Sequence, residues 1–212
     1  MTTFDNVLQK YWFEFYALSD YHWKMERAIG QFYQDEVVIW SQLVDPKARF
    51  LRKREETPKL LDIFPMTLRY SYVTILYMHV ESMLSELCDA LCDQRSLSLR
   101  VSHLNGSLLE RSKRYVFKFA GFVQSTSDWN TIDELSKIRD CIVHAGGEVA
   151  RSRDEKYLVA LAKHLGPDNI QIGLRMNRAS EWLVIREGYL ISLTKRLRDF
   201  TEALSQDLTT AV

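Results

Sequence analysis

An arginine and a histidine lie five positions apart near the predicted end of a helix, at Arg139 and His144. The guanidinium group of arginine is planar, permanently charged and well suited to holding phosphate oxygens. The imidazole of histidine gains and loses a proton near neutral pH, so it can act as a general acid or base. Side chains of these two types could therefore transfer a proton beside a bound phosphate group.

The segment around these residues has the features of a helix with a defined end. It opens at Asn130 or Thr131, both of which are common helix-starting residues. An apolar stripe at helical spacing follows, formed by Ile132, Leu135, Ile138 and Ile142. Gly146 and Gly147 then end the helix, because glycine accepts the left-handed conformation of a C-terminal cap.

The spacing of Arg139 and His144 also limits how they can act. Five residues at about 100° per residue place the two side chains roughly 140° apart around the helix. We therefore expect that one copy of the chain cannot easily bring both to one atom. Two copies facing each other across a two-fold axis could each contribute an arginine and a histidine to a shared groove.

A second helix is predicted over Tyr70–Cys88, where an apolar run carries one acidic residue, Glu81, before a leucine-rich end. Together with Arg-x4-His and the glycines that follow it, this pattern resembles the HEPN-domain proteins. Many of these are metal-independent ribonucleases, often toxins or defence components. The resemblance covers roughly residues 66–205 and implies an all-α fold, an antiparallel helical bundle. This chain has Asp140 where family members usually have asparagine.

The resemblance implies a role for each site residue. Arg139 and His144 would be catalytic, and Asp140 and Glu81 would orient them. His144 would take the proton of a ribose 2′-hydroxyl while a second histidine protonates the departing 5′-oxygen, so the products would end in 2′,3′-cyclic phosphate. Such a reaction needs no metal and no other cofactor. The expected partners are RNA, a second copy in a homodimer, and an antitoxin or defence-complex protein.

Two other interpretations of the same residues stay open. A histidine and an arginine near a helix C-terminus also complement the helix dipole and bond its last carbonyls, which is a structural role. In that case the chain is either a catalytically inactive HEPN-like module that binds RNA or nucleotides, or a helical protein-interaction module that works through its aromatic N-terminal helix.

The composition favours a local RNA-binding patch over a globally basic surface. The 212 residues have a formal net charge of zero, so RNA must be held locally. Arg111, Arg114 and Lys118 share one face of a helix predicted over residues 107–124 and form the best candidate patch. Three cysteines cannot all pair, and no signal peptide or long apolar run is present, which favours a cytoplasmic location without a membrane partner.

The predicted architecture divides the chain between residues 65 and 66. Residues 1–65 would form a long N-terminal helix over 2–44 and a basic connector over 45–65 that prolines bracket. Residues 66–212 would form the HEPN-like helical bundle. Its predicted elements, besides the helix that carries Arg139, are helices over 66–93, 107–124, 153–164 and 187–207, and strands over 170–174 and 182–185 that pair through a turn at 177–180 as a small C-terminal β-hairpin.

Overall fold

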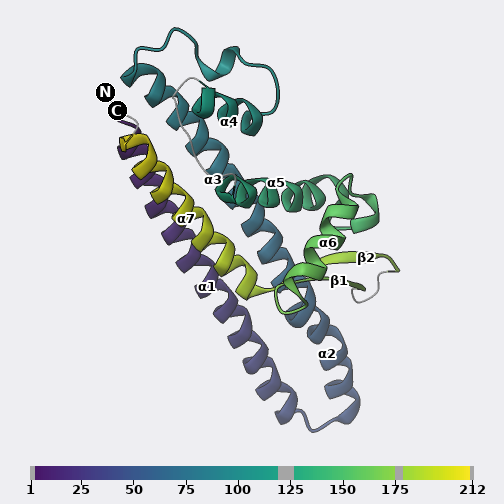
Figure 1. Ribbon diagram of the computed structural model, residues 1–212. Coiled ribbons are helices and arrows are strands. Elements are labelled where there is room, and N and C mark those ends of the chain that lie inside the picture. Colours follow the sequence, from purple (N-terminus) through teal and green to yellow (C-terminus); the bar gives the residue numbers. More distant parts are fainter. Residues whose placement is uncertain (1–2, 119–126, 175–178, 211–212) are drawn as a thin grey trace. The chain divides into compact units, whose positions relative to one another are not determined.

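The computed structural model describes residues 3–118, 127–174 and 179–210, and most of them are helical. The elements are α1 (Phe4–Gln42), α2 (Pro46–Pro58), the π-helical turn η1 (Lys59–Ile63), α3 (Phe64–Gln94), the short 3-10 helix η2 (Val101–His103), α4 (Leu108–Lys118), α5 (Ser127–Ala145), the 3-10 helix η3 (Val149–Arg151), α6 (Glu155–Leu165), β1 (Ile170–Leu174), β2 (Glu181–Ile185) and α7 (Glu187–Thr210) (Figure 1). The predicted long first helix, the last helix and the small antiparallel hairpin are therefore confirmed. The predicted continuation of α4 to residue 124 and part of the hairpin turn lie outside the described residues.

The chain folds as two compact units, and neither is continuous in sequence. Unit 1 comprises Met1–Leu18, Ile75–Ser136 and Ser192–Val212, and unit 2 comprises Ser19–Thr74 and Lys137–Ile191. These units do not coincide with the segments 1–65 and 66–212, which stay a prediction.

In unit 1, helices pack around a shared apolar core. The start of α1 runs beside the end of α7, as Figure 1 shows, and the Asp5 carboxylate accepts a hydrogen bond from the Ser205 hydroxyl at 2.7 Å. Trp129 of α5 packs edge-on against Phe200 of α7, with ring centroids 5.2 Å apart. The apolar seam of α1 supplies the buried side chains Phe4, Leu8, Tyr11 and Phe15. These side chains recur every three or four residues, so one face of this part of α1 packs into the core.

Residues 45–65 were predicted to be a connector, but all of them after Asp45 are helical. Asp45 caps α2 by accepting a hydrogen bond from the backbone N–H of Lys47 at 2.9 Å, and Pro46 fits the first helical turn. Pro58 cannot donate the next helical hydrogen bond, and the wider π turn η1 follows it before α3 begins. The prolines therefore adjust the helix instead of ending it. No residue of α2 is buried, whereas Leu60 in η1 is.

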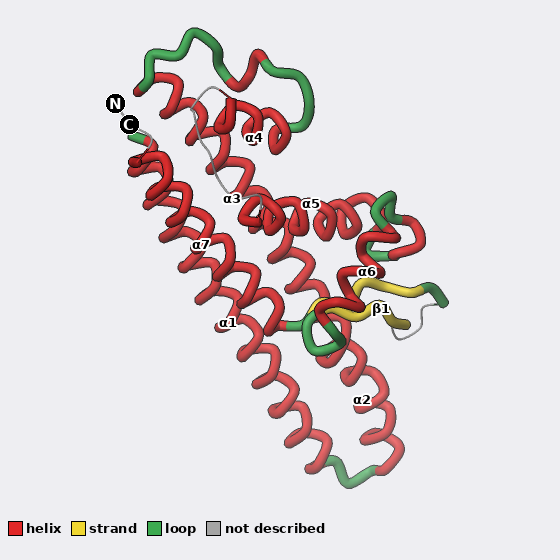
Figure 2. The backbone as a smooth tube through the Cα atoms, viewed as in Figure 1, coloured by secondary structure: helices red, strands yellow, loops and turns green. Residues whose placement is uncertain are grey.

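In unit 2, the hairpin of β1 and β2 lies beside α6, as Figure 2 shows. The two strands are antiparallel, with Ile170 opposite Ile185 and Leu174 opposite Glu181. Ile170, Leu183 and Ile185 are fully buried. This alternation buries one face of the hairpin against its unit.

A buried polar cluster links α1 to α3 within unit 2. His22 is buried, and its ring centroid lies 4.4 Å from that of Tyr72. Arg69 binds both carboxylate oxygens of Glu26, at 2.6 and 2.9 Å, and its third contact is the carbonyl of Ile185 at 3.1 Å. Arg69 therefore joins the first helix, the second long helix and the hairpin of unit 2.

Candidate functional site

The end of α5 has the capped geometry that the double glycine predicted. Gly146 and Gly147 have φ angles of +64° and +92°, and the backbone N–H of Gly147 bonds the carbonyl of Cys141 at 3.0 Å. Two successive left-handed glycines and this bond from residue 147 back to residue 141 close the C-terminal end of the helix. The predicted stripe residues Ile132, Leu135 and Ile138 are fully buried, and Ile142 is partly buried. The last two turns of α5 are therefore anchored on one side and open on the other.

The hairpin and α3 hold this helix end in place within unit 2. The backbone N–H of Leu183 in β2 bonds the carbonyl of Gly147 at 2.9 Å, and the Tyr70 hydroxyl donates to the carbonyl of Leu183 at 2.6 Å. A side chain at Gly147 would collide with the Tyr70 ring and hydroxyl. Glycine is thus required here for two reasons, its left-handed backbone and the close approach of Tyr70.

Asp140 is the centre of the charged cluster on the open side of α5. It is largely buried, and its Oδ1 atom lies 2.8 Å from Nη1 of Arg139 and 3.9 Å from Nε2 of His144. One copy of the chain therefore brings Arg139 and His144 to the same carboxylate oxygen, and the expectation that it could not is wrong. His144 follows Asp140 by four residues and so lies on the same helix face. The long side chain of Arg139 reaches across to the Asp140 carboxylate.

Arg153 is a member of this cluster that the sequence pattern did not predict. Its Nη2 atom contacts Oδ2 of Asp140, so the two carboxylate oxygens each face the guanidinium of a different arginine. Arg153 lies just before α6, where the chain has turned back after the double glycine. The signal in the sequence that could have placed Arg153 beside α5 is the double glycine, because it allows the chain to turn back there.

The exposure of these side chains determines what they could do. The His144 side chain is 67% exposed and that of Arg153 is 78% exposed, whereas that of Arg139 is 27% exposed and that of Asp140 is 10% exposed. A ligand can therefore reach His144 and Arg153 freely and Arg139 in part, while the Asp140 carboxylate stays behind them. Burial raises the pKa of the nearby Cys141 thiol to about 11, so Cys141 is a neutral thiol and not a nucleophile at neutral pH.

Comparisons with family models, with curated proteins and with solved structures found no match for this chain. The assignment of the site therefore rests on its own geometry and on the resemblance of its residues to the HEPN pattern.

The described residues contain no group of three or more histidine, cysteine, aspartate or glutamate side chains placed to hold a metal ion. Cys88, Cys92 and Cys141 are all buried, and none of them forms a disulfide. None of the described helices is both long and apolar enough to cross a lipid bilayer.

Glu81, predicted to orient Arg139, is partly buried on α3 in unit 1, whereas Arg139 belongs to unit 2. Arg139 contacts Asp140 within its own unit, and the role of Glu81 stays a prediction.

The predicted RNA-binding patch lies on α4 in unit 1, and its members are not equivalent. Arg114 is exposed, but its guanidinium contacts the backbone carbonyl of Asn105 and so fixes the loop before the helix. Arg111 is partly buried, and Lys118 is exposed in the last turn. A hollow of about 550 Å³ opens beside Arg114, bordered also by Asn105, Gly106, Glu110 and Lys113. Lys118 is therefore the member most available to a nucleic-acid backbone, and RNA binding by this face stays a prediction.

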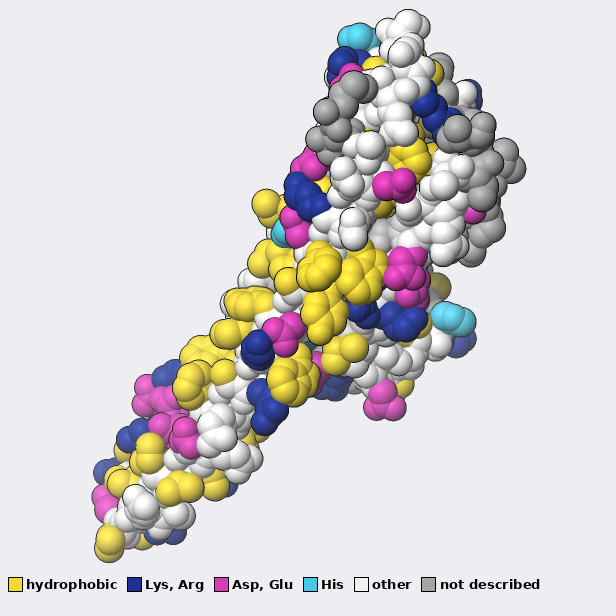
Figure 3. Space-filling view, turned by 90° about the vertical axis from the view of Figure 1, so that its left-hand side faces the viewer, with side chains coloured by type: hydrophobic (Ala, Val, Ile, Leu, Met, Phe, Trp, Pro, Cys, Tyr) yellow, Lys and Arg dark blue, Asp and Glu magenta, His cyan; other side chains and the backbone are white. Residues whose placement is uncertain are grey.

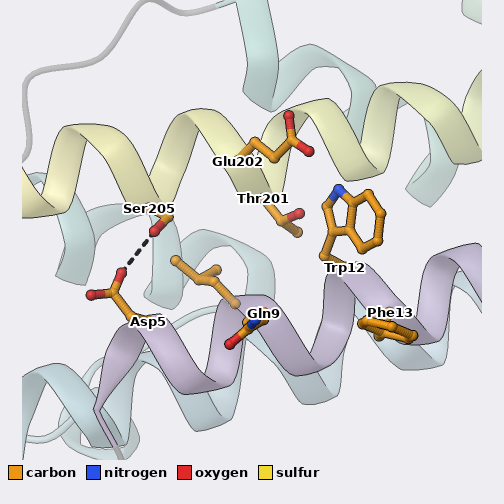
Figure 4. Close-up of a pocket in the computed structure, with 8 residues that line it drawn as sticks. Asp5, Gln9, Trp12, Phe13, Thr201, Glu202 and Ser205 are labelled. Carbon is orange, nitrogen blue, oxygen red and sulfur yellow. Dashed lines mark hydrogen bonds between the residues drawn. The ribbon is translucent and has the colours of Figure 1, made fainter.

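A groove in unit 1 offers a different kind of surface. It lies between α1 and α7, has a volume of about 390 Å³, and is bordered by Asp5, Leu8, Gln9, Trp12, Phe13, Thr201, Glu202 and Ser205 (Figure 4). Phe13 is 64% exposed, and Figure 3 shows hydrophobic side chains gathered on this side of the protein. The Trp12 ring is parallel to that of Tyr16, and Arg198 of α7 lies over both. Part of the aromatic surface of α1 is therefore not used in the core.

Proposed function

We propose that this chain is a metal-independent endoribonuclease of the HEPN type, acting as a toxin or defence component. The observation that carries the proposal is the convergence of Arg139 and His144 on the buried carboxylate of Asp140, at the capped and open end of α5. An exposed imidazole beside an anchored guanidinium is the pair of groups that phosphodiester cleavage requires.

The reaction follows from these groups. Neutral His144 accepts the proton of the ribose 2′-hydroxyl, the 2′-oxygen attacks phosphorus, and the bond from phosphorus to the 5′-oxygen breaks. A second histidine donates a proton to the departing 5′-oxygen, which leaves a 2′,3′-cyclic phosphate and a free 5′-hydroxyl. Arg139 binds the phosphate and stabilises the charge that develops on its oxygens. The substrate must be RNA, because DNA lacks the 2′-hydroxyl.

The second histidine is best supplied by another copy of the chain. A homodimer with a two-fold axis between the α5 ends would place two Arg139–His144 pairs on one groove, with one imidazole as base and the other as acid. The role of Asp140 is to hold Arg139 toward the exposed His144. A toxin of this kind also requires a protein partner that restrains it, in the form of an antitoxin or a defence complex.

Cleavage of RNA in EDTA tests this proposal. The purified chain is incubated with a mixed RNA and with single-stranded DNA of the same length, and the products are separated on a denaturing gel. We expect the wild type to cleave RNA alone and both His144→Ala and Arg139→Ala to lose cleavage with unchanged circular dichroism. His164→Ala is the matched control, since His164 is also an exposed histidine in the last turn of a helix, α6. Equal turnover by wild type and both site variants would refute the proposal.

Two observations favour other candidate functions, and the same proteins separate them. The charged cluster at Asp140 could bind RNA or a nucleotide without cutting it, which predicts a gel shift that His144→Ala leaves unchanged and no cleavage by the wild type. The groove between α1 and α7 favours a protein-interaction module. Under that interpretation the protein neither binds nor cleaves RNA. The Phe13→Ser substitution then changes the molar mass of the assembly in solution.

A further inference from the structure

We propose that Arg153 is a second phosphate-binding residue of the site, held within reach of Arg139 and His144 by the carboxylate of Asp140. The inference rests on the proposed function, because it names a residue that would bind the substrate of that reaction.

Asp140 tethers two arginines at once. It is largely buried, and its two oxygens each contact a different guanidinium, that of Arg139 on α5 and that of Arg153 before α6. The two guanidinium groups therefore lie close together, because each contacts one of the two oxygens of the same carboxylate. Two guanidiniums at this spacing can contact different oxygens of a single phosphate.

The guanidinium of Arg153 keeps donors that a ligand can use. A guanidinium carries five N–H donors, and those of Arg153 face Asp140 through Nη2 and Asp154 through Nε, the latter at 3.5 Å. Its side chain is 78% exposed, and the contacts with Asp140 and Asp154 do not use Nη1. Arg153 can thus bind a phosphate without first leaving Asp140.

The charges around Arg153 are balanced. Asp140 contacts both Arg139 and Arg153, and Asp154 contacts Arg153. The two arginines and two aspartates sum to zero formal charge, and His144 adds a positive charge only when protonated. Asp154 therefore competes with a substrate phosphate for Arg153. If Arg153 contacts the RNA, removing that charge should strengthen RNA binding more when Arg153 is present than when it is absent, which gives a test that loss of structure cannot imitate.

The experiment measures binding with an RNA that cannot be cut, in which every 2′-hydroxyl is methylated. Dissociation constants are determined by fluorescence anisotropy over a range of salt concentrations for the full chain. We expect Arg153→Ala to weaken binding roughly tenfold and to reduce the slope against log salt by about one. Arg151→Ala is the matched control, because Arg151 is an exposed arginine two residues earlier with its own partner, Glu148.

Asp154→Asn completes the test. We expect it to tighten RNA binding about threefold in the wild type and to have no effect in the Arg153→Ala protein. If Arg153→Ala and Arg151→Ala bind alike, or if Asp154→Asn acts equally in both backgrounds, the assignment of Arg153 is wrong.

The assay also separates the role of Arg153 from the proposed function. A wild type that cleaves RNA, together with an Arg153→Ala variant that behaves like the control, refutes the role of Arg153 alone. A wild type that binds RNA through Arg153 without cleaving it refutes the ribonuclease and keeps that role. A wild type that neither binds nor cleaves RNA refutes both.

Discussion

Asp140 places a negative charge where the site must receive a negative substrate, and two arginines offset it. Its carboxylate is largely buried, so leaving it without cationic partners would cost free energy. Arg139 and Arg153 supply those partners and are themselves oriented by the contact. Asp140 therefore has two opposing effects on function. It orients Arg139 and Arg153, and its negative charge weakens the positive potential that they present to a phosphate.

Substitutions at Asp140 should separate these two effects. Asp140→Asn keeps the shape and one acceptor oxygen but removes the charge, so we expect RNA to bind about threefold more tightly while turnover changes little. Asp140→Ala removes the tether, and we expect turnover at saturating RNA to fall at least about tenfold. Initial rates at high and low RNA concentrations distinguish the two. Identical behaviour of both variants would show that Asp140 does not orient the arginines.

Gly147 makes a sharp prediction about stability. Its φ angle of +92° is unfavourable for any residue with a side chain, and Tyr70 occupies the space that the side chain would fill. Gly147→Ala should therefore lower the free energy of unfolding by more than about 3 kcal/mol. Gly146→Ala is the control, because it shares the left-handed backbone but has open space around it, and it should cost about 1 kcal/mol. Urea unfolding followed by circular dichroism measures both, and equal losses would contradict the close packing of Tyr70 on Gly147.

Glu26 gives a prediction about pH. Burial alone would raise the pKa of its carboxyl, but His22 and Arg69 outweigh this through hydrogen bonds and charge and lower the pKa to about 2. His22 is 3.4 Å away, so the bidentate contact with Arg69 is the closer one. A depressed folded-state pKa contributes stability above the unfolded value of 4.5, and this contribution is lost as pH falls toward 2.

The matching experiment compares Glu26→Gln with the wild type at pH 7 and at several values between 4.5 and 2. We expect the ionised carboxylate to contribute up to about 3 kcal/mol at pH 7, with the difference from Glu26→Gln shrinking across that window. Glu36→Gln serves as the control, since Glu36 also binds an arginine through both oxygens but does so at the surface, with Arg52. A difference that stays constant with pH would show that the ionised form of Glu26 contributes nothing.

At the scale of elements, the parts that repeat at helical spacing could be predicted and the parts that depend on reversals could not. The seam of α1 and the stripe of α5 were visible because buried side chains recur every three or four residues. The double glycine marked the end of α5 because few other residues accept its backbone conformation. Pro58 and Pro65 suggested breaks in the helices that do not occur. A proline in the sequence shows that one backbone hydrogen bond is missing, but it does not show whether a wider helical turn can continue the chain past it.

The site itself was only half predictable for the same reason. Arg139, Asp140 and His144 belong to one helix, and their neighbourhood follows from its geometry. Arg153 reaches Asp140 only because the chain turns back after Gly147, and periodicity carries no information about that path. The expected angle between Arg139 and His144 describes where the two side chains leave the helix. It ignores the length of an arginine side chain, which reaches the same carboxylate oxygen that His144 faces.

The exposed face of α4 supports a prediction about salt dependence. If this face contacts the RNA backbone, replacing Arg111, Arg114 and Lys118 by glutamine should weaken binding. The slope of affinity against salt should also fall by about one unit for each phosphate interaction that the substitutions remove. Lys118→Gln alone should show a clean single-residue effect, because Arg114 also fixes the Asn105 loop. Lys195→Gln, which removes an exposed lysine from α7, provides the comparison. A triple variant with the wild-type slope would assign this face to solvent.

For the whole molecule, the proposed reaction requires two histidines, and this makes activity depend on assembly. When wild type and His144→Ala are mixed in equal amounts and allowed to exchange, random pairing leaves about a quarter of the dimers with both histidines. We expect the activity to fall to about one quarter of that of wild type at the same total concentration. If each copy acted alone, the mixture would keep about one half of the wild-type activity. Light scattering at micromolar concentration must report a dimer, and an active monomer would refute the shared site.

The pairing of α1 with α7 has a consequence for how the chain is made. Asp5 and Ser205 are separated by 200 positions in the sequence, yet they share a hydrogen bond in unit 1. A ribosome releases the amino-terminal helix long before it releases the helix that covers it. During that interval the side chains of Phe4, Leu8 and Phe15, which are buried in the finished protein, lack a complete core to pack into, so the nascent chain presents a strip of apolar surface to the cell. Synthesis therefore passes through a stage in which a general chaperone, or an early dimer between two nascent chains, would find a binding site that the finished protein conceals.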